Sequence, residues 1–272
     1  KTAEVIKAIL NASKSVEKPK DKSFSILSNP EFLSEGNAIE DLLKPDRVLI
    51  GGEDLNSIEA LAKIYRSWVS EDKIIRTNLW SSELSKLAAN AFLAQRVSSI
   101  NSIAEICEAT GAAISQVSKA IGTDSRIGEK FLNSGPGFGG SCFKKDILNL
   151  VYLCRYFNLN NSANYWEQII FFNSWHQKRI SKLIVKKLLG NLANKKLAIL
   201  GFAFKANTND TRESPSIYIV KDLLEEGAFI SIHDYKVSKK QIAKDLKIGE
   251  NFDEINVESK WEFNEKIEKN IN

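Results

Sequence analysis

The spacing of apolar residues changes twice along the chain. In the first segment, residues 2–13 place their apolar side chains on one helical face, and residues 55–68 do the same. Short apolar runs at 24–28, 47–50 and 73–76 are bounded by Pro, Gly or polar residues and predict strands. Helices that alternate with strands at this spacing indicate a parallel α/β sheet.

Between residues 81 and 190 the strand signals nearly vanish. Helical periodicity covers most of this stretch, in segments that span 82–109, 114–121, 143–157 and 163–189. We therefore expect a central region built entirely of helices. The first of these helices carries more apolar positions than one small domain covers, which predicts a homodimer through this helix and allows a higher oligomer. Those positions are Leu84, Leu87, Ala91, Ile100 and Ile103.

Strand signals return at 196–205, and a helix at 215–226 and a strand at 229–234 complete one βαβ unit. The pattern predicts an α/β protein with a central helical dimerisation region between two Rossmann-like domains. The expected domain bounds are 1–79, 80–194 and 195–272. Both Rossmann-like domains look partial, and the chain opens at Lys1 without an initiator Met, so we expect a fragment of a longer protein.

Composition removes several classes of function. The 272 residues are 43% hydrophobic and carry a net charge of only +4, with the lysines scattered, so nucleic acid is not an expected partner. Apolar runs fall short of the roughly 20 residues that span a bilayer, so no membrane partner is expected. Three cysteines without a CxxC motif, and two isolated histidines, predict no disulfide framework and no metal site. Unpaired cysteines favour a cytoplasmic location. We expect His176 and His233 to be surface or partly packed residues.

The first candidate for a catalytic segment is the glycine-rich run 135–142, which ends in Cys142 at the predicted start of a helix. Glycines let the backbone approach a ligand, and a helix N-terminus favours an anion. Together with Lys144 and Lys145, that position should favour the thiolate and make Cys142 a nucleophile. Asp146 follows one turn later and suits a role with water or protons. The alternative is a small, inert buried cysteine of the kind expected at Cys107 and Cys154.

Three further segments offer charged or polar groups. Lys86 and Asn90 share one face of a largely apolar helix, where a lysine either extends to water or meets an anion. The loop 29–36 follows a predicted strand and carries Glu31 and Glu35, which are either site groups or surface charges. The segment 201–214 offers cations and helix-terminal N–H groups to phosphates, although it lacks the GxGxxG dinucleotide motif.

Taken in order, five motifs resemble the UDP-glucose/GDP-mannose dehydrogenase family, and the fourth of them is the cysteine loop. They are NPEFLSEG at 29–36, PDRVLIGG at 45–52, SELSKLAANAFLAQR at 82–96, GFGGSCFKKD at 137–146 and GFAFKANTNDTRES at 201–214. The run 82–96 is most similar to animal members that act on UDP-glucose. The resemblance implies an oxidoreductase that converts UDP-glucose to UDP-glucuronate with NAD as cofactor, through a thiohemiacetal and a thioester on Cys142.

The same resemblance implies roles for individual residues. Lys86, Asn90, Glu31 and Asp146 would join Cys142 in catalysis. Glu35 and Arg212 would touch NAD. The residues that it implies for the nucleotide sugar are Phe32, Leu33, Arg126 from a neighbouring subunit, Phe131, Phe138, Gly139 and Lys205.

Three alternatives remain at this point. One is a dehydrogenase of another nucleotide sugar, such as GDP-mannose or a UDP-N-acetylhexosamine. A second is a catalytically inactive truncated paralogue that serves as a dimerisation module. A third, a cysteine acyltransferase or hydrolase that works without NAD, is disfavoured because no motif supplies a histidine base for Cys142.

Overall fold

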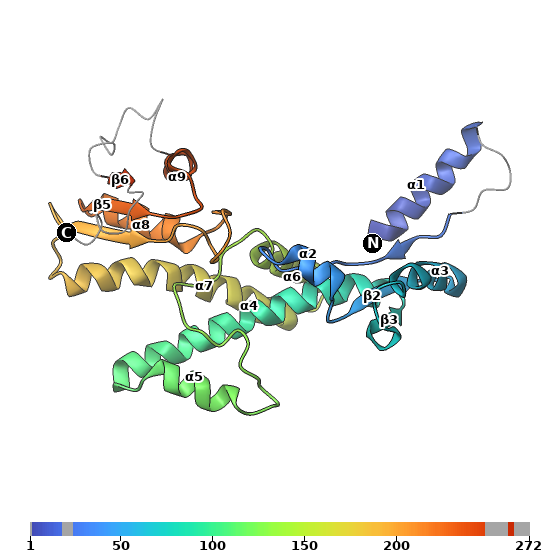
Figure 1. The fold of residues 1–272 in the computed structure, drawn as a ribbon, viewed down its shortest axis with the longest axis horizontal. Coiled ribbons are helices and arrows are strands. Elements are labelled where there is room, and N and C mark those ends of the chain that lie inside the picture. The colour runs from blue at the N-terminus through green and yellow to red at the C-terminus, as the bar shows by residue number, and fades with distance from the viewer. Residues whose placement is uncertain (1, 18–23, 248–260, 264–272) are drawn as a thin grey trace. The chain divides into compact units, whose positions relative to one another are not determined.

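The computed structural model describes residues 2–17, 24–247 and 261–263. The chain forms two compact units, Lys1–Ala89 and Asn90–Asn272, and each is described by itself. The long helix α4 begins in the first unit and continues into the second (Figure 1). Within the described ranges no helix is long and apolar enough to cross a membrane.

The first unit is built on a sheet with the strand order β1-β2-β3. Helices α1 to α3 and one 3₁₀ turn complete it. The elements are α1 (Thr2–Glu17), β1 (Leu27–Ser28), α2 (Ala38–Leu43), β2 (Val48–Gly52), α3 (Leu55–Tyr65), a 3₁₀ turn (Glu71–Lys73) and β3 (Ile74–Thr77). The core lies between the sheet and α3, where Ile50 and Ala62 have no exposed surface.

The orientation of strand β1 differs from the one that the sequence predicts. Strands β2 and β3 are parallel, as predicted, but β1 pairs with β2 in the antiparallel sense, so the sheet is mixed. The short β1 lies directly along Gly51 and Gly52. A Cβ atom on Gly52 would come within 2.5 Å of the Leu27 side chain, so Leu27 packs directly over this glycine.

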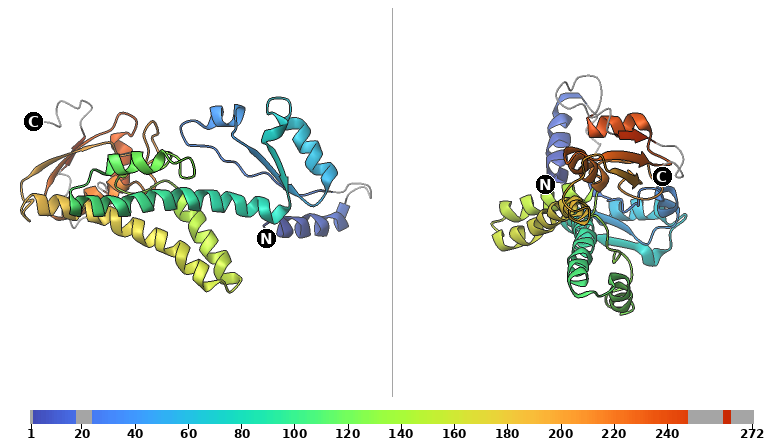
Figure 2. Two further views of the ribbon diagram at one scale, coloured as in Figure 1. Left: turned by 90° about the horizontal axis from the view of Figure 1, so that it is seen from below. Right: turned by 90° about the vertical axis from the view of Figure 1, so that its left-hand side faces the viewer.

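The second unit opens with helices, as predicted from the spacing of apolar residues. They are α4 (Leu79–Thr110), α5 (Ile114–Gly122), α6 (Phe143–Tyr156) and α7 (Asn160–Lys187). Helices α6 and α7 form a hairpin, visible in both views of Figure 2. Its core combines Ala91 and Ala94 of α4 with Ile147, Val151 and other apolar residues of α6, and with Phe138 from the loop before α6.

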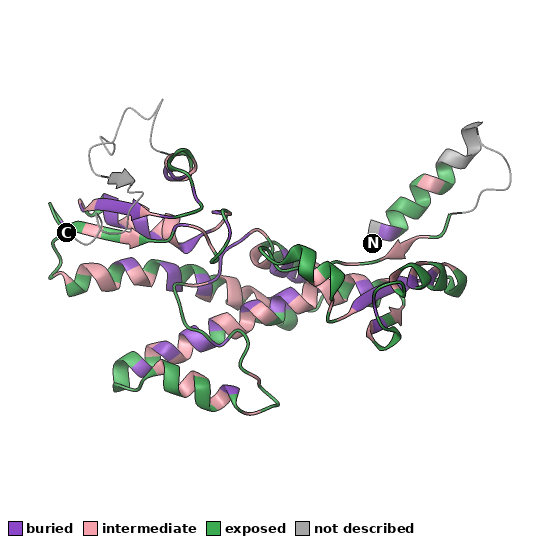
Figure 3. Cartoon of the chain, viewed as in Figure 1, coloured by how far each residue is buried: buried purple, intermediate pink, exposed green. Residues whose placement is uncertain are grey.

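The C-terminal part of this unit is a second sheet with the order β4-β5-β6, and its strands are parallel. Its elements are β4 (Lys196–Leu200), α8 (Pro215–Glu225), β5 (Phe229–His233), α9 (Lys239–Leu246) and β6 (Trp261–Phe263). Ser214 caps α8 through its side chain and Pro215 occupies the first turn, which fixes where the helix begins. Figure 3 shows that buried residues concentrate in β5 and α8.

Helix α7 belongs to the cores of both halves of the second unit. Its first half packs in the α6–α7 hairpin, and its second half places Ile180 and Ile184 against the core of the C-terminal sheet. The Ser181 hydroxyl also donates a 2.5 Å hydrogen bond to Asp222 of α8. The fold class predicted from the sequence, two α/β parts around a helical centre, is confirmed.

Candidate active site

Cys142 is the residue immediately before helix α6, in the N-cap position. Its side chain is exposed, whereas Cys107 on α4 and Cys154 on α6 are buried. The hydroxyl of Ser141 lies 3.7 Å from the Cys142 sulfur. Of the three thiols, Cys142 alone combines access from solvent with the positive end of a helix dipole, which are the properties expected of a nucleophile.

The loop before Cys142 needs glycine for two reasons. Gly137 and Gly140 have φ values of +109° and +81°, a region that favours glycine. Gly139 is constrained by its neighbours, because a Cβ atom there would lie 2.5 Å from the carbonyl oxygen of Glu213. The Gly140 N–H also donates to the carbonyl of Arg212 at 2.8 Å. The cysteine loop is therefore in main-chain contact with the loop that leads into α8.

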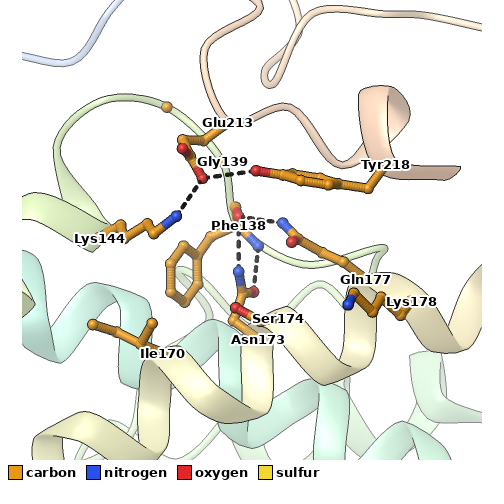
Figure 4. Close-up of a pocket in the computed structure, with 11 residues that line it drawn as sticks. Phe138, Gly139, Lys144, Ile170, Asn173, Ser174, Gln177, Lys178, Glu213 and Tyr218 are labelled. Carbon is orange, nitrogen blue, oxygen red and sulfur yellow. Dashed lines mark hydrogen bonds and ion pairs between the residues drawn. The ribbon is translucent and has the colours of Figure 1, made fainter. Parts of the chain in front are cut away.

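Side chains from the helices satisfy the remaining backbone groups of this loop. The Gly135 N–H donates to Asn101 of α4 at 2.9 Å, and the Gly135 carbonyl lies 2.8 Å from Nε2 of His176. Asn173 and Gln177 of α7 hold the backbone of Phe138 (Figure 4). His176 is only 3% exposed, so the prediction that it is a surface or partly packed residue is wrong.

Asp146 lies in the first turn of α6 and is almost fully buried. The side-chain amide of Asn90 donates to its Oδ2 atom at 2.6 Å. Lys145 lies 3.2 Å from the other carboxylate oxygen. Two residues that the sequence singled out separately are thus in direct contact, one turn of helix from Cys142.

The two lysines that follow Cys142 both have carboxylate partners. Lys144 pairs with Glu213 at 2.9 Å, and Lys145 pairs with Asp146. Glu213 also accepts a hydrogen bond from the hydroxyl of Tyr218. Burial first, and then the Glu213 carboxylate, raise the pKa of Tyr218 above its ordinary value. The lysine charges are therefore shared with these acids and are not directed at Cys142 alone.

Lys144, Glu213 and Tyr218 line a cavity of about 240 Å³ in the second unit. Its walls come from the cysteine loop, from α6, from α7 and from α8 with the loop before it, as Figure 4 shows. Phe138 and Gly139, both predicted to bind the nucleotide sugar, contribute one wall, while Lys144, Lys178 and Glu213 supply charge.

In the first unit, the predicted site residues of the loop 29–36 gather around Lys86. The Lys86 ammonium lies 3.0 Å from the Glu31 carboxylate, whose other oxygen accepts a 2.8 Å hydrogen bond from the Leu33 N–H. The Lys86 side chain is 21% exposed. We expected this lysine to meet either water or an anion, and in this structure the anion is Glu31.

Two cations lie near the aromatic ring of Phe32. The guanidinium carbon of Arg47 is 3.9 Å from the centre of the Phe32 ring, and the Lys86 nitrogen is 5.6 Å from it. A cation over an aromatic face is attracted by the negative charge of that face. Arg47 is a residue that the sequence reading did not single out, although it stands inside the PDRVLIGG motif.

The loops of the C-terminal sheet present the remaining predicted groups. Lys205 is exposed, and the exposed Arg212 side chain pairs with Asp210. Asp234, after β5, accepts hydrogen bonds from the N–H groups of Phe202, Ala203, Lys236 and Val237. Burial acts to raise the pKa of Asp234, but these N–H donors together hold it below its usual value.

The three remaining predicted residues are exposed. The Arg126 side chain is 87% exposed and pairs with Asp124, whose pKa this guanidinium holds below its usual range. Phe131 is exposed and has a φ of +63°. Glu35 is exposed in the turn before α2.

Comparison with known proteins gives matches along most of the chain. Residues 1–69 match the NAD binding domain of the UDP-glucose/GDP-mannose dehydrogenase family, residues 80–175 its central domain, and residues 198–269 its UDP binding domain.

Curated relatives extend this similarity. The chain is 56% identical to UDP-glucose 6-dehydrogenase from Gallus gallus over 90% of its length, and 54% identical to UDP-glucose 6-dehydrogenase 2 from Arabidopsis thaliana over 92%. It spans about half the length of these relatives, 50% and 52% respectively.

A solved structure agrees with the sequence matches. The UDP-glucose dehydrogenase from the archaeon Pyrobaculum islandicum superimposes on 98% of this chain, and the chain covers 56% of that protein, with a TM-score of 0.82 and 30% identity. With matches to all three domains of one family, in the family's order, this chain belongs to the UDP-glucose/GDP-mannose dehydrogenase family.

Proposed function

We propose that the protein containing this chain is an NAD-dependent UDP-glucose 6-dehydrogenase, which oxidises UDP-glucose to UDP-glucuronate. The observation that carries the proposal is the placement of Cys142. Its thiol is exposed at the start of α6, at the end of a loop that hydrogen bonds hold to α7 and to the loop before α8. It lies one helical turn from the Asn90–Asp146 pair. The identity of more than half of the residues to the Gallus gallus and Arabidopsis thaliana enzymes supports the same reaction.

The chemistry needs two oxidations, one covalent adduct and one hydrolysis. Bound NAD would supply the hydride acceptor for each of the two oxidations. The Cys142 thiolate adds to the carbonyl carbon of the aldehyde made in the first oxidation, forming a C–S bond and an oxyanion. The second oxidation converts this adduct to a thioester, and water then breaks the C–S bond, which releases the carboxylate and returns the thiol.

The other residues are proposed to stabilise charge and to move protons. Lys86 and the Asn90 amide would stabilise the oxyanion. Asp146 and Glu31 would take protons from the sugar hydroxyl and from the attacking water. One N–H of the Asn90 amide is committed to Asp146, which leaves its second N–H for the substrate.

Exposed and cavity-lining side chains of this chain fit NAD and the nucleotide sugar. Arg212 is an exposed guanidinium that suits a phosphate, and Glu35 is an exposed carboxylate that suits a ribose hydroxyl. Phe138 and Gly139 face a cavity, and Lys205 is exposed. We propose Glu35 and Arg212 for NAD. Phe32, Leu33, Arg126, Phe131, Phe138, Gly139 and Lys205 are proposed for the nucleotide sugar.

We also propose an oligomeric state, three domain bounds and a cellular compartment for the protein. Two of the apolar positions on which the dimer was predicted, Ala91 and Ile100, are buried within the chain itself and give it no support. The homodimer through α4 is supported instead by Phe92 and Ile106, which are each 58% exposed on that helix. Three domains with bounds at 1–79, 80–194 and 195–272 remain a prediction. A cytoplasmic location is supported by three cysteines that are all free.

The direct test measures NADH formation from UDP-glucose by absorbance. It uses the natural protein that contains these 272 residues, with the Gallus gallus enzyme as positive control. We expect two NADH for each UDP-glucuronate formed, and no glucuronate from the Cys142→Ser variant. Turnover of GDP-mannose or a UDP-N-acetylhexosamine in place of UDP-glucose would overturn the substrate assignment. Absence of turnover with all three would favour the catalytically inactive dimerisation module.

A further inference from the structure

Two amide side chains of α7 enclose the backbone of Phe138. Asn173 accepts from the Phe138 N–H through Oδ1 at 2.8 Å and donates to the Phe138 carbonyl through Nδ2 at 3.0 Å. Gln177 donates to the same carbonyl at 3.0 Å. Figure 4 shows both side chains reaching from one face of α7 to this single residue. The pair from Asn173 reproduces the two hydrogen bonds that a neighbouring strand would make.

The contact is closely fitted as well as polar. Asn173, Gln177 and Phe138 are each less than 9% exposed. A Cβ atom on Gly137 would lie 2.7 Å from Oδ1 of Asn173, so the loop can approach α7 only with glycine at this position. A buried carbonyl that loses its donors is costly, which makes the loop conformation depend on these two amides.

Phe138 in turn contacts the helix that carries the nucleophile. Its ring meets the ring of Phe143 edge to face, with centroids 5.6 Å apart. Phe143 is the first residue of α6 and directly follows Cys142. A continuous series of contacts therefore runs from the amides on α7, through the backbone and ring of Phe138, to the start of α6.

We propose that Asn173 and Gln177 are positioning residues that hold the loop from Gly135 to Cys142 in the conformation that binds the nucleotide sugar. The proposal rests on the proposed function, because it takes Phe138 and Gly139 as substrate contacts. If the loop is already ordered before the substrate binds, binding does not carry the conformational entropy cost of ordering it. Loss of the two amides should therefore weaken substrate binding more than it slows the chemical steps.

The test uses substitutions that preserve shape and remove donors, Asn173→Asp and Gln177→Glu. Each replaces an N–H donor with an oxygen that faces the Phe138 carbonyl. Matched controls on the same helix are Asn164→Asp and Gln168→Glu, because both positions are exposed. In the full-length protein we expect KM for UDP-glucose to rise about ten-fold or more in Asn173→Asp and in Gln177→Glu, with kcat changed by less than about three-fold. The controls should match the wild type.

The pH dependence of KM gives a second readout. Once protonated, the carboxyl introduced by Asn173→Asp can donate to the Phe138 carbonyl and accept from its N–H, as the amide does. The ratio of its KM to that of the wild type should therefore fall between pH 8 and pH 5.5. The titratable groups that line the cavity, Lys144, Lys178, Glu213 and Tyr218, and His176, which contacts Gly135, are common to both proteins and cancel in this ratio.

Hydrogen exchange of the peptide 134–142 tests the loop without any substrate. We expect exchange at least about ten-fold faster in both variants than in their controls. If a buried carboxylate prevents folding, Gln177→Ala removes the donor without adding charge. Unchanged exchange and unchanged KM would overturn the proposal, as would a loss of kcat and thermal stability with KM unchanged, since that pattern marks a purely structural role. Faster exchange in a protein that does not oxidise UDP-glucose would refute the proposed function alone.

Discussion

The side-chain amide of Asn90 on α4 donates a 2.6 Å hydrogen bond to the buried carboxylate of Asp146 on α6. This contact joins two helices whose residues lie 56 positions apart in the sequence. It also gives both proposed catalytic residues a structural role.

We therefore expect Asn90→Leu to destabilise the protein by about 2 kcal/mol, because a buried carboxylate would lose its charge-assisted hydrogen bond. Chemical denaturation would measure this change. In a double-mutant cycle with Asp146→Leu, the two changes should not be additive. Additive effects would show that the hydrogen bond contributes nothing measurable in solution.

The cysteine prediction concerns relative reactivity. Because Cys142 is exposed and Cys107 and Cys154 are buried, iodoacetamide near neutral pH should modify Cys142 first. Peptide mass spectrometry after partial labelling would identify the site. Earlier modification of either buried cysteine in folded protein would refute the nucleophile assignment.

For Lys86, we expect substitution by alanine to lower kcat by roughly a hundred-fold or more, since loss of an oxyanion donor costs about 2.7 to 4 kcal/mol in the transition state. Affinity for UDP-glucose should stay within about ten-fold of the wild type. Lys63→Ala, at an exposed position on α3, is the control. Nearly unchanged turnover with weakened substrate binding would instead assign Lys86 to ground-state binding.

Asp234 should make the protein sensitive to acid. Its folded-state pKa is lowered, so the stability that it contributes is present above the unfolded value of about 3.9 and is lost as pH falls through the folded pKa. Substitution of Asp234 by asparagine should therefore destabilise the protein more at pH 7 than at pH 3. Denaturation at both pH values, with the exposed Asp72→Asn as control, would check this.

The proposed dimer predicts that a charge on the exposed apolar face of α4 will separate the subunits. Light scattering at micromolar concentration should report a dimer for the wild type and a monomer for Phe92→Glu, because burying an unpaired carboxylate in an interface is costly. A monomeric wild type would contradict the proposal.

Much of this architecture follows from the sequence, because helical periodicity and glycine punctuation are local signals. The spacing of apolar residues located α4 to α8, and the glycine-rich run located the start of α6 and the exposed thiol. The orientation of β1 was missed, because a two-residue strand carries no signal for the sense in which it pairs.

Contacts between distant residues were harder to predict. No pattern indicates that Glu31 pairs with Lys86, 55 residues later, or that α7 holds the cysteine loop. One signal was present in hindsight: Asn173 and Gln177 are four residues apart, which places two polar side chains on one face of a packed helix. Buried amides of this kind require partners, and here the partner is the backbone of Phe138.

The contact between the cysteine loop and the loop before α8 is made by main-chain atoms. The Gly140 N–H meets the Arg212 carbonyl, and Gly139 leaves room for the carbonyl of Glu213. Main-chain contacts do not depend on which side chain stands at position 212. Chimeric proteins that combine this central region with the C-terminal sheet of another family member therefore need to preserve the two glycines and the Lys144–Glu213 ion pair at this junction.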